Sequence, residues 1–443
     1  MRYLIKDGSL LLSENGTLKI QKGDLQITDH VITAIQTEGA VTGPAEYDRV
    51  IDARGRLVMP GLINAHTHAY MSLLRNYADD MEFFDWLDRM LAAEDHMTAQ
   101  DCYWGTMLNI IEMIRTGTTS FVDMPIRSSQ EALSGPDGTS VAAVHDSGMR
   151  AWLSRGMVGE ADDQDSLRRF REFFTEMELF KGHDRISFLF GPHATYSCKM
   201  SLLQKIRAYA LERHMGANIH IAESEEETKG IAERYDGMTP VEYIASSGLF
   251  DVPTIAAHCV NVSEKDLQIL KSHHVSIAIN PRSNMKLGNG FAPVDRMLEA
   301  GINVCLGTDS CASNNTQNLF QEMNFAALIY KGKEKKARCV DAADVLRFAT
   351  EGGAKALCME GRLGVLKEGA LADVIILDLN VPQFVPDNDL VSALVYSANG
   401  SEVRTVIVNG QILMEEGELH TINEKEVYDN CRAIARRLSQ GNV

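Results

Sequence analysis

The sequence contains no long uninterrupted apolar run, and this absence limits where the chain can reside. No stretch of about 18 apolar residues in a row is present, so a membrane-spanning helix is not expected. The opening segment, MRYLIKDGSL, lacks the apolar core and small-residue cleavage site of a secretory signal. We therefore expect a cytoplasmic protein without a membrane partner.

Positive charge and paired cysteines are also scarce. Lysine and arginine total 43 against 61 aspartate and glutamate, which gives a formal net charge of −18. This charge opposes binding to nucleic-acid backbones and to anionic lipid surfaces. The eight cysteines form no C-x-x-C pair. Free thiols in a reducing compartment are therefore expected, rather than a disulfide framework.

Both ends of the chain are rich in strand-forming sequence. YLIKDGSLLL and GDLQITDHVITAI lie near the start, and GALADVIILDL and VRTVIVNGQILMEEGEL lie near the end. Asn409–Gly410 is typical of a tight hairpin turn. We expect residues 1–58 and 362–443 to pair into a small β-sandwich domain. A last amphipathic segment, roughly 424–439, is predicted to be helical.

Between the ends, apolar β-favouring runs alternate with helix-patterned stretches. Capping signals mark helix starts, as at Thr98 with Asp101 and at Thr239–Pro240 with Glu242. The alternation predicts an α/β fold, a (β/α)8 TIM barrel over residues 59–361. A doubly wound open sheet is the alternative, disfavoured by the number of runs and by the lack of G-x-G-x-x-G. The predicted strands are 57–65, 118–123, 150–157, 187–193, 216–222, 254–259, 275–280 and 303–308.

Histidines and carboxylates gather at the ends of these predicted strands. The carboxyl ends of barrel strands meet at one mouth, where active sites lie. His66 and His68 share one face of a strand, because side chains repeat their direction every two residues. Core histidines are not expected to sort in this way. The residues at the predicted mouth are His66, His68, His193, His220, Glu223, His258 and Asp309.

These residue types have defined roles in metal-assisted hydrolysis. Neutral imidazoles with a carboxylate suit Zn²⁺ or Fe²⁺ and leave an open position for water, whose pKa the ion lowers to about 7. Asp309 is expected to take the water proton, Glu223 to carry it to the substrate, and His258 to orient the water or stabilise the oxyanion. The strand end GPHATY lacks a bridging lysine, so one metal is expected. The predicted ligands are His66, His68, His220 and Asp309.

The motifs PGLINAHTH, HIAE, AHCV and GTDSCASNN resemble the amidohydrolase superfamily over nearly the whole chain. They most resemble its branch of S-adenosylhomocysteine/5'-methylthioadenosine deaminases and triazine chlorohydrolases. The resemblance implies the ligand set given above, with Glu223 as acid–base group and His258 near the hydrolytic water. It further implies substrate contacts for Glu94 at the ribose, for His193 and for Arg155, with Arg150 as the alternative to Arg155.

The implied activity is hydrolytic deamination of adenosine-type nucleosides: S-adenosylhomocysteine, 5'-methylthioadenosine or adenosine. Metal hydroxide would add to purine C6, Glu223 would protonate N1, and ammonia would leave. One divalent metal per chain, zinc or else iron, and a homo-oligomer are implied as well. An alternative is a hydrolase of another aminated or halogenated heterocycle, for which Glu94, His193 and Arg155 would have no purpose. A second alternative is an inactive barrel scaffold, which would bind no metal.

Some of these residues also have a structural interpretation. Arg155 could be an ion-pair partner inside the barrel, and Glu94 could simply flank a helix. The segment 69–97 is longer than a strand–helix loop needs. Its MEFFDWLDRM stripe either lines the roof of a pocket or packs on the barrel, and Trp86 is the candidate for stacking on a planar heterocycle.

Overall fold

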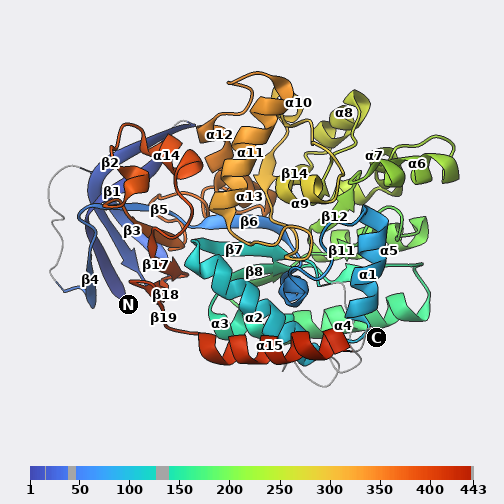
Figure 1. The fold of residues 1–443 in the computed structure, drawn as a ribbon, viewed down its shortest axis with the longest axis horizontal. Helices are drawn as coiled ribbons and strands as arrows, with labels where there is room; N and C mark the ends of the chain where they lie inside the picture. Colours follow the sequence, from blue (N-terminus) through green and yellow to red (C-terminus); the bar gives the residue numbers. More distant parts are fainter. Residues whose placement is uncertain (15, 38–45, 126–138, 441–443) are drawn as a thin grey trace.

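A barrel of parallel strands covered by helices occupies the middle of the chain in the computed structural model, which describes residues 1–14, 16–37, 46–125 and 139–440 (Figure 1). The first four barrel strands pair in one sheet and the last four in another. Parallel bridges from Phe190 to Ala217 and from Thr67 to Asp309 join the two sheets at both seams. The predicted (β/α)8 barrel is therefore confirmed. Its strands are β6 (Leu62–Thr67), β7 (Thr118–Asp123), β8 (Arg150–Leu153), β10 (Ile186–Phe188), β12 (Ala217–Ile221), β13 (Thr254–His258), β14 (Ser276–Ile279) and β15 (Val304–Leu306), with β9 (Gly156–Met157) and β11 (Gly191–Pro192) beyond β8 and β10.

The first predicted run, 57–65, divides between two strands. β5 (Arg56–Pro60) belongs to the sheet formed by the chain ends, and β6 begins the barrel. Gly61 separates them where a Cβ atom would lie 2.1 Å from the Thr119 hydroxyl oxygen, so only glycine fits. Pro60–Gly61 marks this boundary in the sequence, but the apolar residues continue on both sides of it and resemble a single strand.

The helices begin where the capping signals predicted them. Thr98 caps α2 (Ala99–Arg115) in a reciprocal capping box with Asp101, and Thr239 caps α7 (Pro240–Ser247) in the same way. No helix in the described ranges is both long and apolar enough to cross a bilayer. The other helical elements are η1 (Ala69–Leu74), α1 (Phe83–Glu94), α3 (Ser140–Ser147), α4 (Gln164–Leu179), α5 (Met200–Arg213), α6 (Glu225–Arg234), η3 (Leu249–Asp251), α8 (Glu264–Ser272), α9 (Pro281–Lys286), α10 (Val294–Glu299), α11 (Leu319–Glu334), α12 (Ala342–Phe348), α13 (Glu351–Ala356), η4 (Pro382–Phe384), α14 (Leu390–Tyr396) and α15 (Glu424–Gln440).

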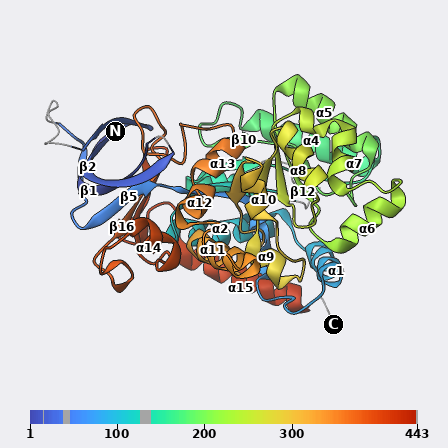
Figure 2. The ribbon, with the colours of Figure 1, turned by 90° about the horizontal axis from the view of Figure 1, so that it is seen from above.

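The two chain ends build one mixed sheet beside the barrel, as predicted (Figures 1 and 2). The sheet curls back on itself, because Ile32 N–H donates to Ala370 O at 2.9 Å and Ala372 N–H donates to His30 O at 2.8 Å. Its additional strands are β1 (Arg2–Glu14), β2 (Thr17–Thr28), β3 (Val31–Gln36), β4 (Arg49–Asp52), β16 (Val374–Asp378), β17 (Val403–Val408), β18 (Gln411–Glu415) and β19 (Glu418–Leu419). Their order is β19-β18-β17-β16-β5-β1-β2-β3, with β4 paired to β1.

The last helix leaves this sheet and returns to the barrel. The helix predicted over 424–439 is α15, which lies along α2 (Figure 1). Its Arg437 forms an ion pair with Asp101 at the start of α2. The domain limits at residues 58/59 and 361/362 stay a prediction, since α15 packs on the barrel rather than on the sheet.

Candidate active site

The carboxyl ends of four barrel strands converge and bring their polar side chains together. His66 and His68 come from the end of β6, His220 from β12, His258 from β13, and Asp309 follows β15. At two of these residues the backbone adopts a left-handed conformation, with φ of +73° at His258 and +60° at Asp309. Non-glycine residues avoid this region, and such strain concentrates at functional sites.

The ring nitrogens and the carboxylate lie at distances suited to one shared ion. His68 Nε2 lies 3.1 Å from His220 Nε2, and Asp309 Oδ1 lies 3.5 Å from His68 Nε2 and 3.6 Å from His66 Nε2. Two nitrogens 2.0–2.1 Å from a tetrahedral zinc lie roughly 3.3 Å apart. Both ring nitrogens of His66 are buried without a hydrogen-bond partner. The residues therefore fit a metal ion, which would satisfy His66 Nε2.

The remaining polar atoms of these groups are held by hydrogen bonds that aim the free atoms at the centre. His68 Nδ1 donates to Met124 O at 2.8 Å, and His220 Nδ1 donates to His193 O at 2.6 Å, so each Nε2 keeps its lone pair. Asp309 Oδ2 accepts from two serine hydroxyls, leaving Oδ1 to face the histidines. These donors are Ser283 Oγ at 2.6 Å and Ser313 Oγ at 2.7 Å.

Burial and neighbouring charges together set the protonation state of each group. It lowers the pKa of His66 and His220 well below the ordinary value, so both rings are neutral. Burial alone would raise the pKa of Asp309, but His258 and then His68 outweigh it and hold that pKa at about 2. Neutral imidazoles and an ionised carboxylate are the forms that bind a metal ion.

Glu223 has the opposite electrostatic setting. Burial, and after it the charges of Asp309 and Glu227, raise its pKa well above the usual range. Its Oε2 lies 3.6 Å from His258 Nε2, and its Oε1 accepts from Asn289 Nδ2 at 3.1 Å. A carboxyl group whose pKa is raised in this way is suited to general acid catalysis.

A small cavity of about 40 Å³ adjoins this cluster, and α1 forms its roof with Phe83, Trp86 and Met90. These side chains are buried, so the stripe in segment 69–97 both packs on the barrel and lines the pocket. Trp86 Nε1 also donates to Ala312 O at 3.3 Å. Only a few water molecules fit, at roughly 10–15 Å³ of such volume each.

Two predicted substrate contacts line this cavity. Glu94 Oε1 accepts from the Tyr70 hydroxyl at 2.7 Å, and Tyr70 keeps its proton because burial and then Glu94 raise its pKa. His193 Nδ1 lies 2.9 Å from Ser197 Oγ, and burial lowers the pKa of His193 to about 3. Both residues therefore present polar atoms beside the His–Asp cluster.

The structure does not bring either predicted arginine to this cavity. Arg155 is buried in an ion-pair cluster with Glu172, at 3.0 Å, and Glu176, so it adopts the alternative role inside the barrel. Arg150 pairs with Asp373 at 2.7 Å, near the opposite end of the strands. A substrate contact by Arg155 stays a prediction, and it would require these ion pairs to break.

Sequence reasoning missed three residues of the site, which lie in PRSNMKLGN after β14. Ser283 reaches Asp309, Asn284 reaches His258, and Asn289 reaches Glu223. The available signal was their place after a seventh strand whose carboxyl end points to the same mouth. Small polar residues at the start of a helix are so common that this signal did not distinguish them.

A barrel with a histidine–carboxylate cluster at the carboxyl ends of its strands defines a class, the metal-dependent barrel hydrolases. The sequence profile of the amidohydrolase family matches residues 57–413. The chain belongs to this family.

Curated relatives match the chain over its whole length. It is 42% identical to a 5-methylthioadenosine/S-adenosylhomocysteine deaminase of Thermoanaerobacter pseudethanolicus, covering 99% of this chain and 100% of that protein. It is 41% identical to a 5'-deoxyadenosine deaminase of Methanosarcina mazei, covering 98% of each. Among solved structures, an adenosine deaminase of Xanthomonas campestris with bound zinc aligns with a TM-score of 0.91 at 28% identity, over 99% of this chain and 98% of that one.

Proposed function

We propose that this chain is a metal-dependent hydrolytic deaminase of adenosine-type nucleosides, with S-adenosylhomocysteine, 5'-methylthioadenosine and adenosine as candidate substrates. The observation that carries the proposal is the convergence of His66, His68, His220 and Asp309 beside Glu223, in a cavity that Glu94 also lines. Full-length relatives named as nucleoside deaminases support it.

The side chains that would hold one divalent ion are His66, His68, His220 and Asp309. Zinc is the first candidate and iron the alternative, because both accept nitrogen and carboxylate donors. A solved adenosine deaminase of similar structure carries zinc, which supports this choice. When bound, such an ion lowers the pKa of water to about 7 and so supplies hydroxide at neutral pH.

The residues of the chain would divide the proton transfers. Asp309 is ionised and accepts the proton of the attacking water, while His258 Nε2 orients that water. Glu223, whose pKa is raised by burial, donates a proton to purine N1. A C6–O bond forms, Asp309 passes its proton to the amino nitrogen, the C6–N bond breaks and ammonia leaves. The hydroxyl on C6 returns its proton to Glu223, so an inosine-type nucleoside is the second product and both carboxyl groups are restored.

Substrate binding would use the side walls and the roof. The Glu94 carboxylate, oriented by the Tyr70 hydroxyl, would accept hydrogen bonds from the ribose, and Trp86 would cover the purine. A nucleoside needs more space than 40 Å³. A neighbouring cavity of about 310 Å³ shares Phe83, so we expect α1 to shift and join the two when substrate enters.

One observation keeps a second candidate in view. Arg155 is engaged by Glu172 and Glu176, so one of the three implied nucleoside contacts lies outside the cavity. A hydrolase of a free base or an aminotriazine would need no ribose contact.

The compartment and the assembly of the protein are also part of the proposal. The eight free cysteines fit a reducing compartment such as the cytoplasm, and a homo-oligomer is expected from the family resemblance.

The test is an ammonia-release assay on S-adenosylhomocysteine, 5'-methylthioadenosine, adenosine, free adenine and an aminotriazine, with metal content measured on the same sample. We expect strong turnover of the adenosine compounds and about one metal per chain. Turnover of only the base or the triazine would replace the proposal by the second candidate. A metal-free chain without turnover would indicate an inactive scaffold.

A further inference from the structure

One short segment contacts three of the proposed catalytic side chains, although these come from three different strands. The segment is residues 283–289, which comprises most of α9 and the turn after it, next to β14 (Figure 1). The hydrogen bonds run from Ser283 Oγ to Asp309 Oδ2 (2.6 Å), from His258 Nδ1 to Asn284 Oδ1 (2.8 Å) and from Asn289 Nδ2 to Glu223 Oε1 (3.1 Å).

This segment is itself held in place. Asn284 N–H donates to Asn280 O at 3.0 Å, and Asn289 N–H donates to Asn284 O at 2.8 Å, so the helix and the turn form one hydrogen-bonded unit. Lys286 Nζ donates to Ala312 O at 3.1 Å, which joins the unit to the loop after β15. A segment anchored at both ends can hold the side chains that it contacts in fixed positions.

We propose that residues 283–289 are the positioning element of this site, and that Asn284 within it fixes His258 as the tautomer with its proton on Nδ1. The inference rests on the proposed function, because it assigns His258 Nε2 as the acceptor that meets the attacking water. Asn284 does not touch the reacting atoms and acts through the ring of His258, so it is a positioning residue.

The geometry around His258 supports this tautomer. The contact of 2.8 Å to Asn284 Oδ1 requires the proton on Nδ1, since an amide oxygen only accepts. Nε2 is then an acceptor and faces Glu223 Oε2 at 3.6 Å. The other amide nearby, Asn280 Nδ2, is farther from Nδ1, at 3.4 Å, and lies 3.3 Å from Ala278 O. His258 and Asn284 are each 1% exposed, so water does not compete for the bond.

The opposite arrangement makes a different prediction. If the Asn284 amide nitrogen faced the ring, it would donate to Nδ1 and the ring proton would lie on Nε2. An aspartate at this position can only accept, so Asn284→Asp preserves the proposed arrangement and destroys the opposite one. Asn284→Ala removes the hydrogen bond to the ring in either arrangement. The pair of variants therefore separates the two tautomers.

The experiment uses the zinc-loaded full-length chain, and it combines kinetics with ¹⁵N NMR of the histidine rings. We expect Asn284→Ala to lower kcat by about 10–100-fold, the usual range for such a partner, with little change in KM and with zinc retained. Asn284→Asp should restore most of kcat. The wild-type chain and Asn284→Asp should both give a protonated Nδ1 at His258.

The inference would be overturned by a proton on Nε2 in the wild-type ring, or by a kcat for Asn284→Asp as low as for Asn284→Ala. If Asn284→Ala fails to fold, the wild-type ring signal alone decides. The NMR readout needs no substrate. A wild-type chain with the Nδ1 proton in place but no ammonia release would therefore sink the proposed function and leave the tautomer assignment standing.

A matched control lies at the other end of the barrel. Asn303 Nδ2 makes two hydrogen bonds of 3.0 Å, to Ser276 Oγ and to Gly352 O, far from the proposed catalytic groups. Asn303→Ala therefore removes two side-chain hydrogen bonds, against the one to His258 that Asn284→Ala removes, and we expect kcat to remain unchanged. A loss of kcat equal to that of Asn284→Ala would mean that general damage explains both, which contradicts a positioning role.

Discussion

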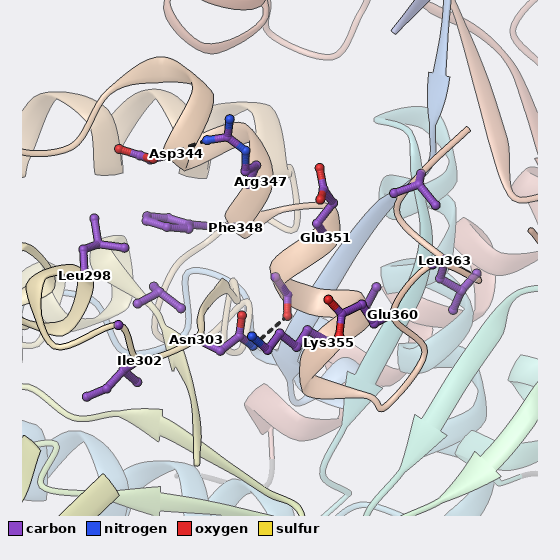
Figure 3. Close-up of a pocket in the computed structure, with 16 residues that line it drawn as sticks. Leu298, Ile302, Asn303, Asp344, Arg347, Phe348, Glu351, Lys355, Glu360 and Leu363 are labelled. Carbon is purple, nitrogen blue, oxygen red and sulfur yellow. Dashed lines mark hydrogen bonds and ion pairs between the residues drawn. The ribbon is translucent and has the colours of Figure 1, made fainter. Parts of the chain in front are cut away.

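The two ends of the barrel carry cavities of opposite character. At the carboxyl ends of the strands, about 40 Å³ is enclosed by buried groups such as Glu223 and Asp309, each 5% exposed. At the amino ends, near the start of β15, a cavity of about 370 Å³ lies between α12, α13 and the following loop. Figure 3 shows Arg347 turned toward Asp344 there, with Lys355 and other charged side chains spread around the hollow.

The difference shows that volume does not identify an active site. The charges around the larger cavity are partly exposed, so water screens them. At the mouth, the exclusion of water strengthens every charge interaction, and neighbouring groups differ in pKa as strongly as Glu223 and Asp309 do. Convergence and desolvation support the smaller cavity as the proposed site of chemistry.

The sharpest test compares Asp309→Asn, at the carboxyl ends of the barrel strands, with Asp344→Asn, beside the larger cavity at their amino ends. Asparagine cannot take the water proton and is a weaker metal ligand, so Asp309→Asn should lower kcat by roughly 10³-fold or more. Asp344→Asn should leave kcat at the wild-type value. Steady-state kinetics and metal analysis on both variants decide the matter, and near-normal turnover by Asp309→Asn would exclude the proposed water activation.

Glu223→Gln should have the next largest effect. The amide keeps the shape of the side chain but has no acidic proton to give, so kcat should fall by about 10²-fold or more. Metal should be retained, because Glu223 faces His258 and Asn289 rather than the ligand cluster. Kinetics and metal content are measured together. Loss of metal in this variant would instead show that Glu223 is a metal ligand.

Glu94→Ala should distinguish the nucleoside from its base. Hydrogen bonds to a charged group are worth about 1.5–3 kcal/mol, so kcat/KM for adenosine should fall by roughly 10–100-fold while that for free adenine changes little. Tyr70→Phe, which removes the donor to Glu94 Oε1, should produce a smaller loss in the same direction. An equal loss on both substrates would exclude a ribose contact by Glu94.

Much of the fold was predictable because its signals are local. The capping box of Thr98 with Asp101 marks a helix start without reference to anything distant, and strand ends carry their histidines within a few residues. The division of 57–65 into two strands was missed, since its apolar residues continue across Pro60–Gly61 and the distant partners of β5 and β6 are not visible in the sequence. Which sheet receives an apolar run depends on tertiary packing, and that is absent from the local pattern.

The candidate site divides in the same way. The histidines and Asp309 are recognisable because few residue types bind metals, and their spacing along the strands is regular. Arg155 was open between two roles, because its pairing depends on carboxylates of α4 whose proximity is set by the fold. Asn284 carried no signal, since asparagine has many uses near helix starts, and only its distance to His258 reveals the one it has here.

A buried acid behind the mouth predicts a pH effect on stability. Glu322 accepts from Arg282 N–H and Asn314 Nδ2, and burial raises its pKa to about 7. The folded state thus holds a proton that the unfolded chain releases near its ordinary pKa of 4.5. The contribution of Glu322 to the free energy of unfolding is fully present below pH 4.5. It is lost as the pH rises through about 7, by on the order of 3 kcal/mol.

Urea unfolding from pH 4.5 to 8 measures this slope. Glu322→Gln cannot titrate, so the fall in unfolding free energy over that window should shrink in the variant. The sign follows from proton counts, because the native state binds more protons than the unfolded state across the window. An unchanged slope in Glu322→Gln would assign the pH dependence to other groups.

The smallest expected effect is the one that could break the comparison between the two ends. Lys355 is exposed on the rim of the larger cavity. Water already solvates its ammonium group, so the folded state loses little stability when this group is removed. Lys355→Ala and the charge reversal Lys355→Glu should therefore change the unfolding free energy by no more than about 0.5 kcal/mol. Both Lys355 variants should leave kcat/KM for adenosine at the wild-type value. Glu223→Gln, measured in the same assay, provides the comparison with a large loss. A loss of about tenfold or more in either Lys355 variant would couple the base of the barrel to its mouth, and the larger cavity would then need a function of its own.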